Sequence, residues 1–256
     1  MKVAAYQAPL LPAGSMAALD LIRKRLDWCE SEGVEILCCP EAVLGGLADY
    51  APRATDFAIA VADGQLDALL APLASNIVTV ILGFTELGDA DRLYNSAVVF
   101  HRGSVVGLYR KLYPAIRKSV YEAGDQTPVF NIGGLTLGIL ICNDSNYVEP
   151  ARKMAAQGAR ALFIPTNNGL PPKRVDVAPE ARSVDIARAI ENRVYVIRAD
   201  VAGRTDDLVS YGSSGIVDLN GTVLQSARRL HEDLIIADLD ISAIGPGHPS
   251  ALGIRL

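Results

Sequence analysis

Apolar residues open the chain as a short continuous run and then recur at helical spacing. Residues 1–8, MKVAAYQA, predict a strand that two prolines then interrupt. Ser15 is a suitable N-cap for a helix that extends to about Glu32. Gly33 is suited to end this helix, because glycine adopts the left-handed conformation common at helix C-termini. The apolar stripe of the helix consists of Leu19, Ile22, Leu26 and Cys29.

Apolar runs and amphipathic stretches continue to alternate as far as residue 240. Hairpins follow the alternating strands and helices twice, which predicts mixed sheets covered by helices and not a purely parallel sheet. No linker rich in proline, glycine or serine divides the chain, so we expect one domain over residues 1–256. The predicted strands are 34–40, 77–86, 135–142, 159–166, 194–200 and 233–240, the helices 65–75, 149–157 and 179–193, the hairpins 94–111 (through Arg102 and Gly103) and 214–227 (through Asn220 and Gly221), and the loop 170–179.

The composition is that of a soluble globular protein. Half of the 256 residues are hydrophobic and 21% are charged, which excludes a disordered chain. The net charge is −5 and no stretch concentrates lysine and arginine, so a nucleic-acid partner has little support. The first 14 residues are too short in apolar length for a signal peptide, and no window is apolar enough to span a membrane. We therefore expect a cytoplasmic protein without a membrane partner.

The thiols and imidazoles do not form a metal-binding pattern. Without a secretory signal, reduced cysteines are the expectation. Cys38 and Cys39 point to opposite faces if they lie on a strand, so they are poor disulfide partners. The cysteines are Cys29, Cys38, Cys39 and Cys142, and the widely spaced histidines are His101, His231 and His248. We expect no metal site.

Three predicted strands end in a chemically reactive side chain. Glu41 follows the run VEILCCP, Lys111 follows GLYR, and Cys142 ends LTLGILIC. Each has an ordinary alternative: a solvated turn residue, a surface charge, and a small core residue, respectively. Taken together, a carboxylate, an ammonium and a thiol supply a general base, an oxyanion stabiliser and a nucleophile, which is a complete set for acyl transfer.

The stretches PEAVLGG, YRKLYP and ICNDSNYVEP occur in this order, and the chain resembles the nitrilase superfamily of carbon–nitrogen hydrolases. VAAYQAP, GFTE, YNSAVVFHRG, YEAGDQTPVF, RAIENRVYVIRAD and YGSSGIVDLNGTVL extend the resemblance over residues 2–240. It implies an α/β fold, a four-layer α-β-β-α sandwich with mixed sheets, and a homodimer or larger homo-oligomer. It also implies that Cys142 is the nucleophile, Glu41 the general base and Lys111 the stabilising cation.

The chemistry of these three residues predicts hydrolysis of a small amide-type substrate through a thioester. Lys111 would favour the thiolate of Cys142, and Glu41 would accept the thiol proton. Lys111 and the backbone N–H of Asn143 are the expected donors to the oxyanion, and Glu41 would then protonate the leaving nitrogen and activate water. This sequence of steps needs no metal and no organic cofactor.

The resemblance also marks a position for a second glutamate, which falls near Ser119. Glu122 is the nearest acidic candidate for the substrate site, and its alternative is an ordinary loop carboxylate. Arg117 and Lys118 could meet an acidic substrate, or they could be solvated loop charges.

The residues after the cysteine bear on the choice of substrate. Nitrilases of the superfamily usually have Trp-Glu there, whereas amidases and carbamoylases more often have an aromatic residue and an acid. Asp144 fits the second pattern and Asn143 departs from both, so amide or N-carbamoyl hydrolysis is favoured. Asp144 also has a structural interpretation, as an acceptor of backbone N–H bonds that caps the following segment. Asn167 and Asn168 either bind a substrate amide or carboxylate, or are turn residues.

Other functions remain open at this level. The first is hydrolysis of a nitrile. The second is a catalytically silent relative that serves as a binding or scaffold protein, against which the presence of all three reactive residues argues. The third is a glutaminase subunit that delivers ammonia to a synthetase; since the chain has no phosphate-binding P-loop, this function would need a separate partner.

Overall fold

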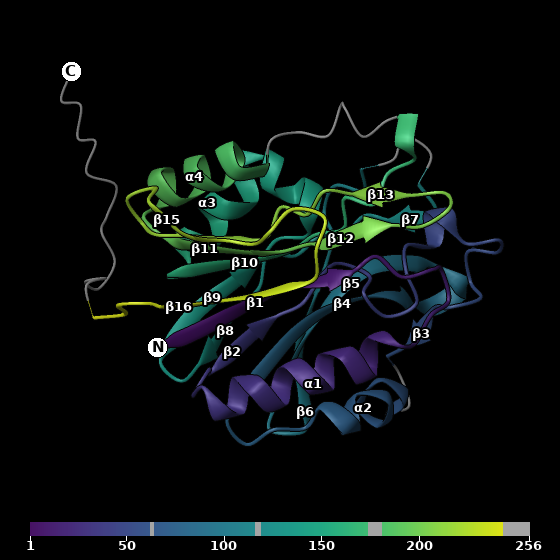
Figure 1. Ribbon diagram of the computed structural model, residues 1–256, viewed down its shortest axis with the longest axis horizontal. Coiled ribbons are helices and arrows are strands. Elements are labelled where there is room, and N and C mark those ends of the chain that lie inside the picture. Colours follow the sequence, from purple (N-terminus) through teal and green to yellow (C-terminus); the bar gives the residue numbers. More distant parts are fainter. Residues whose placement is uncertain (62–63, 116–118, 174–180, 243–256) are drawn as a thin grey trace.

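Two mixed β-sheets pack face to face, with helices on both outer faces, in a computed structural model that describes residues 1–61, 64–115, 119–173 and 181–242. Helices α1 and α2 cover one sheet, and α3 and α4 cover the other (Figure 1). The predicted α-β-β-α sandwich is therefore confirmed. The first sheet has ten strands in the order β13-β12-β1-β2-β4-β5-β6, with β16 on β1, β3 on β4 and β7 on β5. The second has six strands in the order β15-β14-β11-β10-β9-β8.

The elements follow the predicted alternation closely. The helices are α1 (Ala18–Ser31), α2 (Gln65–Leu70), α3 (Val148–Ala156) and α4 (Ala181–Asn192). The strands are β1 (Lys2–Pro9), β2 (Ile36–Cys38), β3 (Ile59–Ala60), β4 (Thr79–Leu87), β5 (Leu93–His101), β6 (Ser104–Arg110), β7 (Tyr121–Glu122), β8 (Val129–Ile132), β9 (Leu135–Ile139), β10 (Ala161–Pro165), β11 (Tyr195–Ala199), β12 (Val201–Arg204), β13 (Val209–Ser210), β14 (Gly215–Val217), β15 (Val223–Ser226) and β16 (Asp233–Asp238). Part of the predicted loop 170–179 lies outside the described residues.

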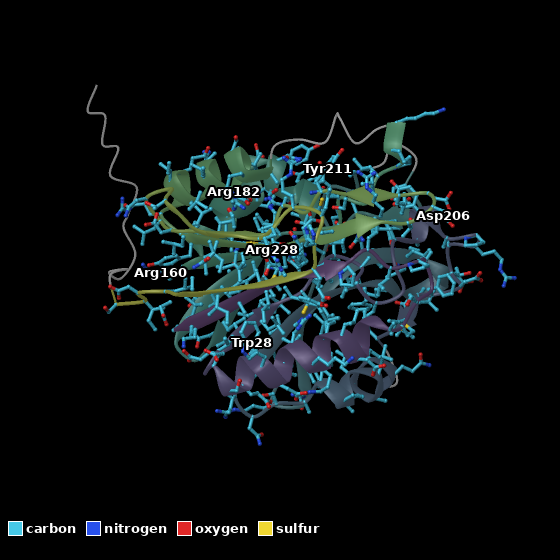
Figure 2. All side chains as sticks on the ribbon, in the orientation of Figure 1. Trp28, Arg160, Arg182, Asp206, Tyr211 and Arg228 are labelled. Atoms are coloured by element: carbon cyan, nitrogen blue, oxygen red, sulfur yellow. The ribbon has the colours of Figure 1, made fainter. Side chains whose placement is uncertain are left out.

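The alternation of side chains on the strands creates two cores. Successive residues of β1 point to opposite faces, so Val3 joins the core that lies against the six-stranded sheet and Ala4 joins the core under α1. Cys38 and Cys39 are divided between the two cores in the same way, as predicted. Side chains fill the space between the layers, whereas Trp28 lies on α1 and is half exposed (Figure 2).

The first helix begins later than predicted. Ser15 is not its N-cap: α1 starts at Ala18, and the Ser15 hydroxyl accepts a hydrogen bond from the backbone N–H of Ala17 in the preceding turn. Its far end is as predicted, with Gly33 in the left-handed region at φ +69°. The hairpin between β5 and β6 turns through Arg102 and Gly103, both at positive φ, as a two-residue hairpin turn requires.

The apolar pattern did not indicate the described strands β3, β7, β8, β12 and β13, and one of them, β12, changes how the two sheets connect. Strand β8 forms a hairpin with β9. Strand β12 follows β11 after a single residue, Asp200, but it pairs with β1 in the other sheet. Asp200 is therefore the point at which the chain crosses from the six-stranded to the ten-stranded sheet.

The ion pair between Asp185 of α4 and Arg198 of β11 is buried. Arg198 donates to both carboxylate oxygens at 2.5 to 3.0 Å, and neither side chain is more than 2% exposed. We expect Asp185→Ala to lower the free energy of unfolding by about 3–5 kcal/mol, because it leaves a buried guanidinium without its counter-ion. Urea denaturation measures this loss.

The matched control is the exposed pair between Arg23 and Asp27 of α1, whose N–O distance is 2.6 Å. We expect Asp27→Ala to cost about 1 kcal/mol or less, because solvent screens an exposed pair. Equal losses in the two variants would contradict a special role for the buried pair.

Candidate active site

Glu41, Lys111 and Cys142, from three different strand ends, line one cavity of about 240 Å³. Glu41 follows β2, Lys111 follows β6, and Cys142 follows β9. The Lys111 Nζ donates to the Glu41 Oε1 at 2.5 Å, and both side chains are buried. The fold thus brings together the carboxylate, the ammonium and the thiol that the sequence indicated.

The carboxylate of Glu41 is held on both oxygens. Its Oε1 also accepts from the Asn95 Nδ2 at 2.7 Å, and its Oε2 accepts from the Asn167 backbone N–H at 2.9 Å. Gly83 of β4 lets the backbone approach closely, because a Cβ there would lie 2.6 Å from the Glu41 Cα. These contacts give the Glu41 carboxylate a single orientation in the cavity.

Cys142 sits on a sharp, strained turn. Its φ is +45°, a left-handed value that is uncommon for a residue with a side chain. The following turn of 3₁₀-helix, Cys142–Asn146, is tied back by the Ser145 hydroxyl, which donates to the Cys142 carbonyl at 2.7 Å. A strained backbone conformation of this kind persists only where the surrounding structure imposes it. The turn directs the Cys142 thiol from the end of the strand into the cavity.

Asp144 holds the same turn through hydrogen bonds to its side-chain carboxylate. Its fully buried carboxylate accepts from the Ile141 N–H at 3.0 Å, the Tyr109 hydroxyl at 2.8 Å and the Tyr113 N–H at 2.8 Å. Asp144 therefore accepts backbone N–H bonds, as its structural interpretation proposed. The two backbone donors, Ile141 and Tyr113, both precede Asp144, so its carboxylate does not cap the following segment as expected. It instead joins the cysteine turn to the segment after Lys111.

The electrostatic balance keeps the thiol protonated. Burial raises the pKa of Cys142 to about 12, and the negative charge of Glu41 adds to the rise. Lys111 and Arg198 act in the opposite direction, so the sign predicted for Lys111 is right but its effect is outweighed. Burial alone lowers the pKa of Lys111, yet Glu41 raises it above its ordinary value, so the ammonium stays charged. The resting site thus holds a neutral thiol beside an ion pair.

We expect the free enzyme to show no thiolate ultraviolet absorbance from Cys142 at neutral or mildly alkaline pH. A thiol whose pKa is raised to about 12 is protonated throughout that range. The measurement is the difference in absorbance between the native chain and Cys142→Ser as the pH rises. A step close to about 8.5, the ordinary thiol value, would contradict this electrostatic account.

The other predicted site residues fall into two groups. Asn143, Asn167 and Asn168 line the cavity, whereas Glu122 is exposed and is not among the described residues that line it. The Asn143 Nδ2 donates to the Tyr113 carbonyl at 2.9 Å. The Asn167 backbone N–H donates to Glu41, and its side-chain oxygen accepts from the Gly169 N–H, so its turn role is confirmed while it also lines the cavity.

The marked second-glutamate position has a different carboxylate beside it. Ser119 donates to the Asp49 Oδ2 at 3.2 Å, and both residues line the cavity. Arg117 and Lys118 lie outside the described residues.

Three residues were missed in the sequence: Asn95 and Arg198, which line the cavity, and Asp200, which accepts a hydrogen bond from the Asn168 Nδ2. Asn95 lay within a stretch already matched to the superfamily, and its place next to a strand end was an available signal. Arg198 and Asp200 are charged residues at the end of the apolar run VYVIRAD. A charge inside such a run must find a buried partner, which is the signal that could have identified both.

Among the described helices, none combines the length and the apolar character needed to cross a membrane. A family model described as carbon–nitrogen hydrolase matches residues 2–248.

Two curated relatives are each 32% identical to this chain. One is a nitrilase from Pyrococcus abyssi, over 85% of this chain and 81% of its own length. The other is an (R)-stereoselective amidase from a Pseudomonas species, over 82% of this chain and 74% of its own length. A crystal structure of an amidase from Nesterenkonia sp. is similar, with a TM-score of 0.78 and 26% identity, covering 93% of this chain and 90% of that one.

Proposed function

This chain belongs to the carbon–nitrogen hydrolase family, and we propose that it hydrolyses a small amide or N-carbamoyl compound through a thioester on Cys142. The observation that carries the proposal is the buried ion pair of Glu41 and Lys111 on the same cavity as the strained cysteine turn. The cavity of about 240 Å³ is below the usual range of about 300–1,000 Å³ for ligand pockets, which favours a small substrate.

The reaction begins with a neutral thiol. Glu41 removes the proton from the Cys142 Sγ as the sulfur attacks the substrate carbonyl carbon and forms the C–S bond. The carbonyl oxygen becomes an oxyanion, which the Lys111 ammonium and the Asn143 backbone N–H stabilise. Since Lys111 keeps its charge, this stabilisation is present before the reaction starts and costs no reorganisation.

The tetrahedral intermediate then collapses. Glu41 returns its proton to the leaving nitrogen, the C–N bond breaks, and ammonia or an amine departs from the thioester. Glu41 next accepts a proton from water, whose oxygen attacks the thioester carbonyl. The C–S bond breaks, the proton returns to sulfur, and the carboxylic or carbamic acid leaves.

Nitrile hydrolysis is the second candidate, and the 32% identity to a protein named nitrilase supports it. The residues after the nucleophile, Asn143 and Asp144, favour the amide. A silent scaffold is disfavoured, because a protein without catalysis has no use for a buried charge pair beside a strained cysteine.

Ammonia release from a panel of small amides, N-carbamoyl amino acids, glutamine and nitriles tests the proposal. We expect release from at least one amide or carbamoyl compound. Release from nitriles alone would overturn the choice of substrate class, and no release from any member would favour the silent relative.

We further propose that residues 1–256 act as one hydrolase domain and assemble as a homodimer in the cytoplasm. The half-exposed apolar side chains of Tyr147, just before α3, and Ile190, on α4, support an assembly surface on that face. A nucleophile that must stay a reduced thiol suits a reducing compartment. Sedimentation velocity measures the assembly state, and a monomer at all concentrations would contradict the dimer.

A further inference from the structure

The side-chain amide of Asn168 lies next to the nucleophile in a defined orientation. Its Oδ1 accepts a hydrogen bond from the Cys142 thiol, with an Sγ–Oδ1 distance of 3.8 Å. Its Nδ2 donates to the Asp200 Oδ2 at 2.9 Å and to the Ser213 hydroxyl oxygen at 3.2 Å. Both amide hydrogens therefore point away from the thiol, and the carbonyl oxygen points toward it.

Asp200 prevents the amide from flipping. Its fully buried carboxylate sits at the crossing between the two sheets and accepts from the backbone N–H groups of Val201 at 2.8 Å and Asn168 at 3.0 Å. The Ser213 hydroxyl donates to its Oδ2 at 2.6 Å. If the Asn168 amide flipped, its carbonyl oxygen would face the Asp200 carboxylate. The flip would break the charge-assisted hydrogen bond between the two side chains and would place two oxygen acceptors against each other. The orientation is thus a consequence of the buried charge.

The cavity therefore presents opposite polarity to the two ends of an amide. Lys111 offers a donor to the substrate oxygen, whereas Asn168, on the loop after β10, offers only an acceptor beside the sulfur. A primary amide or a ureido group carries N–H donors on the scissile nitrogen that match this acceptor. A nitrile nitrogen and an ester oxygen carry no hydrogen and leave the acceptor unpaired.

We propose that, once Glu41 has taken the thiol proton, the Asn168 Oδ1 accepts a hydrogen bond from the N–H of the leaving nitrogen, and that Asp200 is the positioning residue of Asn168. The inference rests on the proposed function and adds to it a selection for substrates with an N–H on the scissile nitrogen. The bond also turns the lone pair of that nitrogen, as the tetrahedral intermediate forms, toward the protonated Glu41 that must reach it. Sites that hydrogen-bond a substrate N–H discriminate strongly against analogues without it.

The test compares an amide with the methyl ester of the same acyl group, as the ratio of their kcat/KM values. We expect Asn168→Ala to lower this ratio about tenfold or more, because ester hydrolysis does not use the acceptor. Asp200→Asn should lower the ratio in the same direction, since the neutral side chain permits Asn168 to flip. Asn131→Ala, on the exposed side of β8, is the matched control and should leave the ratio unchanged.

The inference is overturned if amide and ester rates fall by the same factor in Asn168→Ala, since a purely structural role predicts that result. Circular dichroism identifies a variant that does not fold; if Asp200→Asn is lost in this way, Asn168→Ala still decides the question. Failure of the native chain to hydrolyse any amide or N-carbamoyl compound is a separate outcome, which would remove the proposed function itself.

Discussion

Cys142→Ala is expected to lower kcat for amide hydrolysis by at least about 10⁴-fold, the largest effect of any single substitution in this chain. The alanine methyl group cannot form the thioester. Without the attacking sulfur, the remaining groups of the site have no tetrahedral intermediate to stabilise. Ammonia release under saturating substrate measures the loss. Substrate binding should persist, because the cavity wall is otherwise unchanged.

Cys29→Ala is the matched control, since it removes a buried thiol of α1 that lies in the core under that helix and does not line the cavity. It should retain activity while its stability falls slightly. Substantial turnover by Cys142→Ala would show that another group carries the reaction.

Glu41→Gln is expected to lower kcat by about 10³-fold or more, because the proposed mechanism uses this one carboxylate as base and as acid in both halves of the reaction. The direction in which the pKa of Cys142 changes distinguishes this role from a general disruption of the site. The negative charge of Glu41 raises the pKa of Cys142, so its removal should lower that pKa and increase the thiolate fraction. More thiolate with less turnover is the expected combination, measured by thiolate absorbance and ammonia release on the same sample.

Glu149→Gln, an exposed carboxylate in the first turn of α3, is the control and should change neither quantity. A Glu41→Gln variant that retains native turnover would contradict the assignment of the base. A variant that loses turnover with the thiol pKa unchanged would instead indicate that Glu41 acts only through the position of Lys111.

The sequence predicted the parts of the site that depend on local pattern. Glu41, Lys111 and Cys142 each follow an apolar run, and strands that end at one edge of a sandwich bring such residues together. The hairpin through Arg102 and Gly103 was predictable for the same reason, since its turn chemistry is local.

The sequence did not predict what depends on distant partners. Asp200 matters because it binds Asn168, which lies 32 positions earlier in the chain. It also marks the point where the chain changes sheet, which the periodicity of apolar residues does not predict. The protonation state of the Cys142 thiol was missed for a related reason. The effect of Lys111 on the pKa of the thiol was foreseeable from its charge, but the burial that raises this pKa depends on how the layers pack.

The most direct test of the central claim, a thioester on Cys142, is the partitioning of the acyl group between water and added hydroxylamine. Two substrates that share an acyl group but differ in leaving group, such as a primary amide and its methyl ester, must pass through the same thioester. The account predicts the same ratio of hydroxamate to acid from both. Ratios that depend on the leaving group would contradict a shared covalent intermediate, and with it the role assigned to Cys142.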